Sequence, residues 1–388
     1  MVVAGIIAEY NPFHRGHQYH IEQTRKLTGA NYIVVVMSPD FVQRGAPALM
    51  DKHTRAKMAL EGGADLVIEL PLDCACSSAE YFANGSITLL DNLQVVDYLS
   101  FGSECGDIKA IKKLGTALYD ETDTFQEILK SELKTGKSFP VARKIALSQE
   151  FPEYADILDS PNNILAIEYC ASIINYHSHM KPVTITRTAD NYHDTNLSET
   201  YSSASAIRNA LLTNDLACIK DEIPNTSFKT FGTNWLLNGP LCEDDFSSQL
   251  KYKLLSETAD SLTNYLDVSK SLANRIVKSL NDFKSFSQFA DLLKSKDLTR
   301  TRINRALLHI LLNIKDVSPI KYARILGFRK NAQPLLSKIK EHSSIPLVTK
   351  PSEVDYDVFA ANLYESVLCE KYQRSFVHEY SKPVVINF

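Results

Sequence analysis

Two histidines near the start of the chain have the residue type and spacing for phosphate chemistry. His14 and His17 flank Gly16 within residues 10–17, Tyr-Asn-Pro-Phe-His-Arg-Gly-His. Imidazole N–H groups donate hydrogen bonds to phosphate oxygens, and a glycine lets a nucleotide approach the backbone closely. The alternative interpretation is a loop that contains two histidines by chance. The strand and the helix predicted on either side of the motif favour the interpretation as a phosphate site.

A strand is predicted before this motif and a helix after it. Residues 2–8 are an apolar run with the length of one buried parallel strand. Apolar residues recur at helical spacing over residues 19–27, and Gly29 ends that pattern. Free backbone N–H groups and the helix dipole make such a junction an anion site. We therefore expect the loop to bind the phosphates of a nucleotide.

Residues 202–208, Ser-Ser-Ala-Ser-Ala-Ile-Arg, are a second candidate phosphate-binding element. Serines at the entry to a helix, followed by an arginine within two turns, can hold phosphate oxygens. Ser203 and Arg208 are the residues expected to do so. Ordinary capping of the helix by the serines is the alternative. A polar loop is predicted just before this element, over residues 189–201.

The first half of the chain alternates buried-strand runs with helical patterns, which is typical of a parallel α/β sheet. Further strands are predicted over residues 32–37, 64–71, 95–101 and 183–187. In open α/β sheets, ligands bind beyond the carboxyl ends of the strands. The residues expected at those ends are His14, His17, Arg44, Gly102 and Glu104.

The chain is long enough for two domains, and its strand signals fade after residue 216. We predict a Rossmann-like α/β domain over residues 1–215 and a mainly helical domain over residues 216–388. Residues 296–340 hold eleven Lys or Arg against two Asp, although the whole chain carries a net charge of −4. A concentrated basic stretch favours a polyanionic partner, and a solvated basic helix face is the alternative.

The basic residues expected to contact nucleic acid lie within this stretch. Arg302, Arg305 and His309 are predicted to share one helix face, opposite an apolar face that includes Ile303 and Leu307. Such a face suits contact with a nucleic-acid backbone. The predicted contact residues are Arg302, Arg305, Lys321, Arg324, Arg329 and Lys330.

Composition narrows the class of protein. An apolar content of 44% and a charged content of 23% are ordinary for a globular protein. The longest apolar runs, such as residues 32–37, are far too short to span a membrane, and no secretion signal is evident. Seven scattered cysteines without a C-x-x-C pair indicate reduced thiols in the cytoplasm and no zinc site.

The two phosphate motifs together resemble the H-x-G-H nucleotidylyltransferase superfamily. Four blocks also resemble the bacterial tRNA(Met) cytidine acetate ligase family: residues 9–14, residues 62–71, residues 101–104 and residues 301–305. The resemblance implies an enzyme that uses ATP to activate acetate as acetyl-adenylate. The acetyl group then passes to N4 of the wobble cytidine, position 34, of elongator tRNA(Met), giving N4-acetylcytidine.

The resemblance also implies an ATP site, with His14 and His17 as the catalytic residues. Its residues are Ile7, Ala8, Glu9, Tyr10, Asn11, Pro12, Phe13, His14, Arg15, Gly16, His17, Gln18, Tyr19, His20, Gly102, Asn162 and Arg187, to which the second motif adds Ser203 and Arg208. That motif has no lysine, unlike the K-M-S-K-S loop of class I synthetases, so Arg208 must serve as its cation. Mg²⁺ is expected on the phosphates of the substrate, because no carboxylate pair offers a metal site.

Two other functions stay open at this point. A small-molecule adenylyltransferase of cofactor synthesis would share the first domain, and a non-catalytic tRNA-binding protein would keep only the fold. Asp40, Arg44 and Glu104 are further candidates for a part in the transfer to cytidine.

Overall fold

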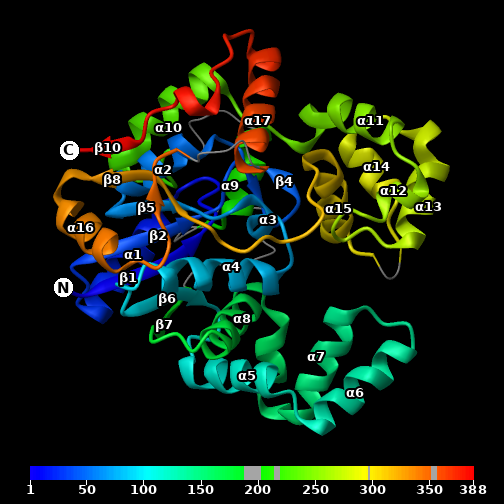
Figure 1. Ribbon diagram of the computed structural model, residues 1–388, viewed down its shortest axis with the longest axis horizontal. Coiled ribbons are helices and arrows are strands. Elements are labelled where there is room, and N and C mark those ends of the chain that lie inside the picture. The colour runs from blue at the N-terminus through cyan, green and yellow to red at the C-terminus, as the bar shows by residue number, and fades with distance from the viewer. Residues whose placement is uncertain (188–201, 214–218, 296–297, 351–355) are drawn as a thin grey trace.

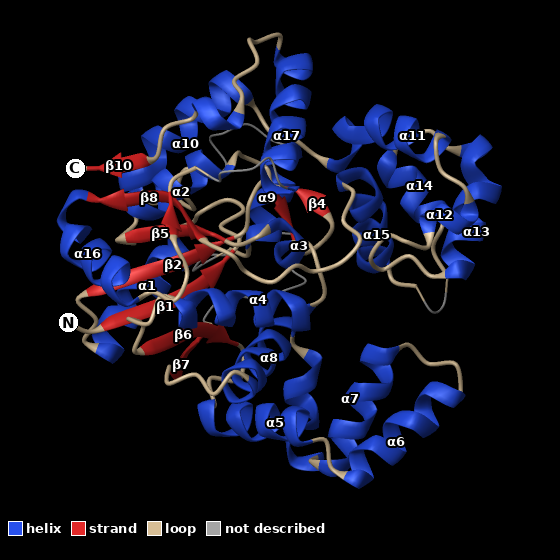
Figure 2. Cartoon of the chain, in the orientation of Figure 1, coloured by secondary structure: helices blue, strands red, loops and turns tan. Residues whose placement is uncertain are grey.

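A mostly parallel sheet forms the centre of the molecule, which the computed structural model describes over residues 1–187, 202–213, 219–295, 298–350 and 356–388. The strands are β1 Val3–Ala8, β2 Tyr32–Met37, β3 Phe41–Val42, β4 Ala46–Pro47, β5 Leu66–Glu69, β6 Tyr98–Ser103, β7 Lys181–Thr186, β8 Ala323–Arg329, β9 Leu347–Val348 and β10 Val385–Asn387. The eight-stranded sheet has the order β10-β8-β5-β2-β1-β6-β7, with β9 paired to β8, and β3 and β4 form a separate hairpin (Figure 2).

Helices surround this sheet. They are α1 Arg15–Thr28, α2 Lys52–Glu61, α3 Leu72–Ala75, α4 Ala79–Asn92, α5 Ile108–Asp120, α6 Asp123–Lys134, α7 Phe139–Glu150, α8 Pro161–Asn175, α9 Ala204–Thr213, α10 Asn225–Asn238, α11 Ser247–Leu255, α12 Ala259–Leu262, α13 Lys270–Ser279, α14 Phe286–Leu292, α15 Arg300–Leu312, α16 Gln333–His342 and α17 Tyr356–Tyr372. No helix in the described ranges has the length and apolar character needed to cross a membrane.

The five strands predicted from the sequence are all present and lie parallel to one another, in the order β5-β2-β1-β6-β7. The pairing of β1 with β2 runs from Val3 opposite Tyr32 to Ala8 opposite Met37. Their apolar runs are continuous because helices cover both faces of a parallel sheet. The predicted Rossmann-like α/β fold is confirmed. The polar loop predicted over residues 189–201 lies outside the described residues.

The two faces of the sheet bury separate cores. One face packs against α4, α5, α8 and α16 through side chains such as Val36, Leu90 and Leu114. The other packs against α1, α2, α9 and α10 through side chains such as Val35 and Ile207. A third core joins α11 to α15 with α17, in a helical lobe beside the sheet (Figure 1).

The C-terminal half is mainly helical, as predicted, but part of it returns to the sheet. Strand β8 pairs antiparallel with β5, and β10 pairs with β8 in parallel. Ala323 and Ile325 of β8 are buried in the same core as the first strands. The expectation that strand signals fade after residue 216 therefore missed β8 and β10. The predicted boundary does not separate the sheet from the remainder of the chain.

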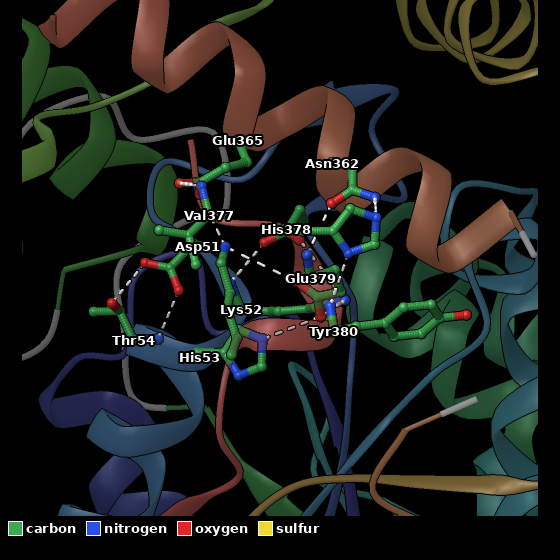
Figure 3. Close-up of polar contacts among 12 residues, drawn as sticks. Asp51, Lys52, His53, Thr54, Asn362, Glu365, Val377, His378, Glu379 and Tyr380 are labelled. Carbon is green, nitrogen blue, oxygen red and sulfur yellow. Dashed lines mark hydrogen bonds and ion pairs between the residues drawn. The ribbon is translucent and has the colours of Figure 1, made fainter. Parts of the chain in front are cut away.

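A buried cluster of charges fixes the end of the chain to the sheet (Figure 3). Lys52 Nζ lies 2.6 Å from Glu69 and 3.0 Å from Glu379, while His53 Nε2 lies 3.1 Å from Glu379. Arg324 lies 2.9 Å from Glu69 and 2.7 Å from Glu379. Burial alone would raise the pKa of Glu379, but Lys52, His53 and Arg324 outweigh it and hold this pKa well below its usual range.

Candidate functional site

The loop after β1 is held in place by a buried arginine. Arg55 of α2 is fully buried. Its guanidinium donates hydrogen bonds to the backbone oxygens of Glu9 at 2.7 Å, Ser38 at 3.1 Å and Met50 at 2.9 Å. Tyr10 follows with a φ of 48°, which turns the chain sharply at the end of the strand. The loop is therefore preorganised by contacts that are distant in sequence.

His14 and His17 form a reciprocal cap at the start of α1. His14 is the N-cap residue, and its Nδ1 accepts a hydrogen bond from the backbone N–H of Gly16 at 3.1 Å. His17 Nδ1 accepts from the backbone N–H of His14 at 3.3 Å. A neutral imidazole that accepts through Nδ1 carries its proton on Nε2. The two caps therefore leave an Nε2–H donor on each ring.

Burial keeps these imidazoles uncharged. Burial, together with the charges of Arg187 and Arg208, lowers the pKa of His14 from 6.5 to about 3. Burial, His14 and Arg187 also hold the pKa of His17 well below 6.5. His20, which is hydrogen-bonded through Nε2 to Ser100 at 3.1 Å, has its pKa lowered to about 4, chiefly by burial. The rings of His14 and His17 stack with centroids 3.7 Å apart. At neutral pH this pair consists of neutral donors.

A cavity opens over the carboxyl ends of β1 and β6, where the sequence predicts the nucleotide. We call it the nucleotide cavity. Thirteen of the residues predicted for the ATP site line it: Ile7, Ala8, Glu9, Tyr10, Asn11, His14, His17, His20, Gly102, Asn162, Arg187, Ser203 and Arg208. Gly16 and Tyr19 line a smaller adjoining cavity that shares His14, His17 and Arg187.

Four predicted residues line neither cavity. Phe13 is fully buried and packs against Gly62, where a Cβ would lie 2.2 Å from the phenyl ring. Arg15 is exposed and donates to the backbone oxygen of Asp221 at 3.1 Å. Pro12 is buried, and Gln18 is half-buried on α1. These side chains support the loop or face away from it.

The second motif meets the first across the cavity. Arg208 donates to the backbone oxygen of Asn11 at 2.7 Å and to Ser205 Oγ at 3.0 Å. Ser203 Oγ accepts from the backbone N–H of Ala206 at 3.1 Å, so it does cap α9 as the alternative interpretation held. The start of α9 also lines the nucleotide cavity through Ser203, Ala204 and Ser205. Ser203 therefore caps α9 and also lines the cavity.

Glu104 and Asp40 hydrogen-bond to neighbouring protein groups and do not line the nucleotide cavity. Glu104 accepts from Asn162 Nδ2 at 2.7 Å and from the backbone N–H of Asn163 at 2.9 Å, which fixes Asn162 at the start of α8. Asp40 accepts from the backbone N–H of Lys52 at 2.7 Å and is buried. Neither residue lines the nucleotide cavity, whereas Arg44 does.

An apolar wall of the cavity went unrecognised in the sequence. Phe82, Phe101, Leu165 and Tyr169 also line the cavity, together with Gln43 from the β3–β4 hairpin. The Phe101 and Tyr169 rings pack with centroids 5.8 Å apart. Such residues read as ordinary core positions in their strand or helix, so only their meeting at one cavity identifies them.

The six predicted nucleic-acid contacts do not form one surface. Arg302 and Arg305 lie on α15, where Arg305 pairs with Asp267 at 3.1 Å, and the exposed Lys321 follows that helix. Arg329 and Lys330 lie beside the chain's end, far from α15 in Figure 1.

Two residues expected on the basic surface are buried instead. Arg324 is 3% exposed because it pairs with Glu69 and Glu379, so the expectation of a nucleic-acid contact there is wrong. His309 is fully buried and bonded to the backbone oxygens of Leu266 at 2.9 Å and Cys76 at 3.0 Å. Its assignment to the basic face is also wrong.

Comparison with known proteins identifies the family. The HIGH Nucleotidyl Transferase family matches residues 1–379. A tRNA(Met) cytidine acetate ligase of Acetivibrio thermocellus is 38% identical, with 96% of each chain covered, and one of Clostridium perfringens is 41% identical, with 94% of this chain and 95% of the relative covered.

Solved structures agree with these matches. The Thermotoga maritima TmcAL crystal structures, apo and bound with alpha-thio ATP, superpose with TM-scores of 0.93 and 0.91. Both are 31% identical in sequence, and 100% of this chain and 99% of theirs is covered. The chain therefore belongs to the tRNA(Met) cytidine acetate ligase family of HIGH nucleotidyl transferases.

Proposed function

We propose that this chain is the tRNA(Met) cytidine acetate ligase of its organism. It joins acetate to AMP from ATP, releases pyrophosphate, and then acetylates N4 of the wobble cytidine of elongator tRNA(Met). Relatives that carry this name match nearly the whole chain. The alternative of a small-molecule adenylyltransferase leaves the helical lobe and its basic residues without a role.

The observation that carries the proposed chemistry is the pair of Nε2–H donors on His14 and His17. An acetate oxygen attacks the α-phosphorus, the bond to the pyrophosphate oxygen breaks, and negative charge grows on the leaving group. Donors that already point into a water-poor site stabilise such charge without reorganising. Because both rings are neutral, each can give one hydrogen bond to a phosphate oxygen and retain its proton throughout.

Arg208 and the start of α9 complete the proposed phosphate site. A guanidinium and the backbone N–H groups of a helix N-terminus both favour anions. Arg208, Ser203 and Ser205 line the same cavity as the two histidines. We assign them to the β- and γ-phosphates, and Gly102, Asn162 and Arg187 to the remainder of the nucleotide.

We further propose that Mg²⁺ arrives on the triphosphate, where it would neutralise part of the phosphate charge. Within the described ranges, no group of three or more His, Cys, Asp or Glu side chains could hold a metal ion. The residues present thus do not fit a protein-bound metal site, and the residue roles above do not depend on one.

The tRNA contact is proposed for the α15 side of the molecule. Of the six predicted contacts, Arg302, Arg305 and Lys321 lie on or just after α15, whereas Arg324 is buried. Lysine and arginine contacts to phosphates position a nucleic acid without reading its sequence.

One experiment tests the proposed function against its alternatives. Protein is incubated with ATP and radiolabelled acetate, with and without a tRNA(Met) transcript. Acetyl-adenylate formation without tRNA, and labelled tRNA when it is added, support the proposal. Adenylation without any need for acetate would instead indicate a cofactor-forming adenylyltransferase, and tRNA binding without nucleotide turnover would indicate a binding protein.

A further inference from the structure

A third cavity also adjoins the nucleotide cavity, and residues of the loop after β1, the β3–β4 hairpin and α9 line both of them. We call it the acceptor cavity. It has a volume of about 290 Å³, close to the lower end of the roughly 300–1,000 Å³ typical of small-molecule sites. It shares five lining residues with the nucleotide cavity: Glu9, Asn11, Arg44, Ser205 and Arg208. A ligand in one cavity therefore lies next to a ligand in the other.

The chemistry of the acceptor cavity suits a pyrimidine. Val42, Pro47, Leu49 and Leu241 supply an apolar wall, against which the face of a base can pack. Glu9 supplies a carboxylate at the boundary, held by a hydrogen bond from the backbone N–H of Gln43 at 3.1 Å. Carboxylates accept hydrogen bonds from the N4 amino group of cytosine. A base with an exocyclic amino group can use this acceptor, and the small volume of the cavity favours the smaller, pyrimidine ring.

The acceptor cavity is also packed directly against the basic helix. Val42, Arg44, Ala46 and Pro47, which line it, belong to the β3–β4 hairpin. At the turn of this hairpin Gly45 has a φ of +75°, and a Cβ there would lie 2.4 Å from the backbone nitrogen of Arg305. A glycine is required for that approach. The hairpin thus joins the cavity to the first turns of α15, the helix assigned above to tRNA.

We propose that the acceptor cavity receives the cytidine that is to be acetylated, extruded from the anticodon, with N4 directed past Glu9 toward the acyl-adenylate. This inference rests on the proposed function. N4 forms a bond to the acetyl carbon, and the bond from that carbon to the AMP oxygen breaks. AMP leaves with the electron pair, and one N4 proton passes through the Glu9 carboxylate to water. The base must leave its stack because the cavity admits a nucleobase and no helix.

The test obstructs the acceptor cavity without touching the nucleotide cavity. Leu212 lies on α9, is 53% exposed and lines the acceptor cavity but neither the nucleotide cavity nor the smaller cavity that adjoins it. Leu212→Trp places an indole at its rim. Thr213→Trp is the matched control, because Thr213 is the exposed next residue of the same helix and lines neither cavity.

Two assays are run on each full-length protein: acetate-dependent ATP–pyrophosphate exchange without tRNA, and transfer of radiolabelled acetate to a tRNA(Met) transcript. We expect Leu212→Trp to exchange pyrophosphate like the wild type and to transfer acetate roughly 100-fold more slowly, the cost of a misplacement of about 1 Å. Thr213→Trp should match the wild type in both assays.

Normal transfer by Leu212→Trp would overturn the assignment of the cavity. An equal loss of exchange and transfer, absent from Thr213→Trp, would overturn it as well, since the cavity would then belong to ATP. Failure of the wild type to show any acetate-dependent exchange is a separate result, which would contradict the proposed function.

Discussion

Replacing His14 by asparagine separates the two tasks that this residue performs. Its Nδ1 caps α1, and its Nε2, which is buried and has no hydrogen-bond partner among the described residues, is the donor that we assign to a phosphate. Asparagine is one of the best N-cap residues, and its side-chain oxygen can accept from Gly16 much as Nδ1 does. Its side chain ends before the position of Nε2, so the donor is lost. His14→Ala loses the cap and the donor together.

The two variants should differ in stability and agree in activity. Both lose the ring contact with His17, with centroids 3.7 Å apart, which is worth about 0.5–1.5 kcal/mol. His14→Ala also loses the cap, at a further cost of about 1 kcal/mol. Removal of one preorganised donor slows such reactions by about 10²–10³-fold. We therefore expect acetate-dependent pyrophosphate exchange to be slower by this factor in both variants.

Denaturant unfolding and pyrophosphate exchange, measured on both variants and the wild type, check this prediction. His14→Asn should be the more stable variant by about 1 kcal/mol and no more active than His14→Ala. Exchange by His14→Asn within a few-fold of the wild type would refute the donor role. An activity that followed stability across the three proteins would show that His14 acts only through the fold.

The remaining predictions concern charge and pH. The ring signals of His14 and His20 should stay unshifted in an NMR titration of the free protein as the pH falls through 6.5, because their folded-state pKa values are lowered to about 3 and about 4. Signals that titrate near 6.5 would contradict their burial. Arg324→Gln should lower the free energy of unfolding by about 3–5 kcal/mol, because it leaves buried carboxylates unpaired. Arg302→Gln should leave the free energy of unfolding unchanged and should reduce the slope of log affinity for tRNA against log salt concentration by about 1. Equal effects of the two changes on tRNA binding, at unchanged stability, would contradict this division. Folding lowers the pKa of Glu379, so the stability that this carboxylate contributes is present above its unfolded-state pKa and is lost as the pH falls. Glu379→Gln should therefore be less stable than the wild type at neutral pH and should lose less stability in acid. Parallel curves of unfolding free energy against pH for the two proteins would exclude this role.

The nucleotide site could be predicted because its signals are local. His14, Gly16 and His17 lie within one turn of chain that follows a continuous apolar strand. The cap that sets both tautomers involves only residues 14–17, so short-range geometry determines it. The rule that ligands bind at the carboxyl ends of parallel strands then placed Gly102 correctly beside the two histidines.

Other features depend on pairings across long sequence distances. Strand β8 carries Arg324 and Arg329, so its sequence indicates a basic surface. It becomes a buried strand only because Glu69 and Glu379, far apart in the chain, neutralise Arg324. No pattern in a single sequence shows that distant carboxylates neutralise an arginine. The basic residues were therefore predicted to form one surface.

Arg55 illustrates the same limit at the site itself. An arginine on a helix is usually exposed, yet this one is buried among carbonyl oxygens of the loops that shape the cavity. Its partners are backbone groups, which carry no residue-type signal. The sequence identified groups that line the cavity and missed the arginine that holds the surrounding loops.

A crystal structure with a non-hydrolysable ATP analogue and acetate tests the central claim most directly. We predict Nε2 of both His14 and His17 at about 3 Å from phosphate oxygens, with both Nδ1 atoms still accepting from the backbone. A triphosphate bound away from both rings, or rings turned so that Nδ1 faces the ligand, would contradict the account.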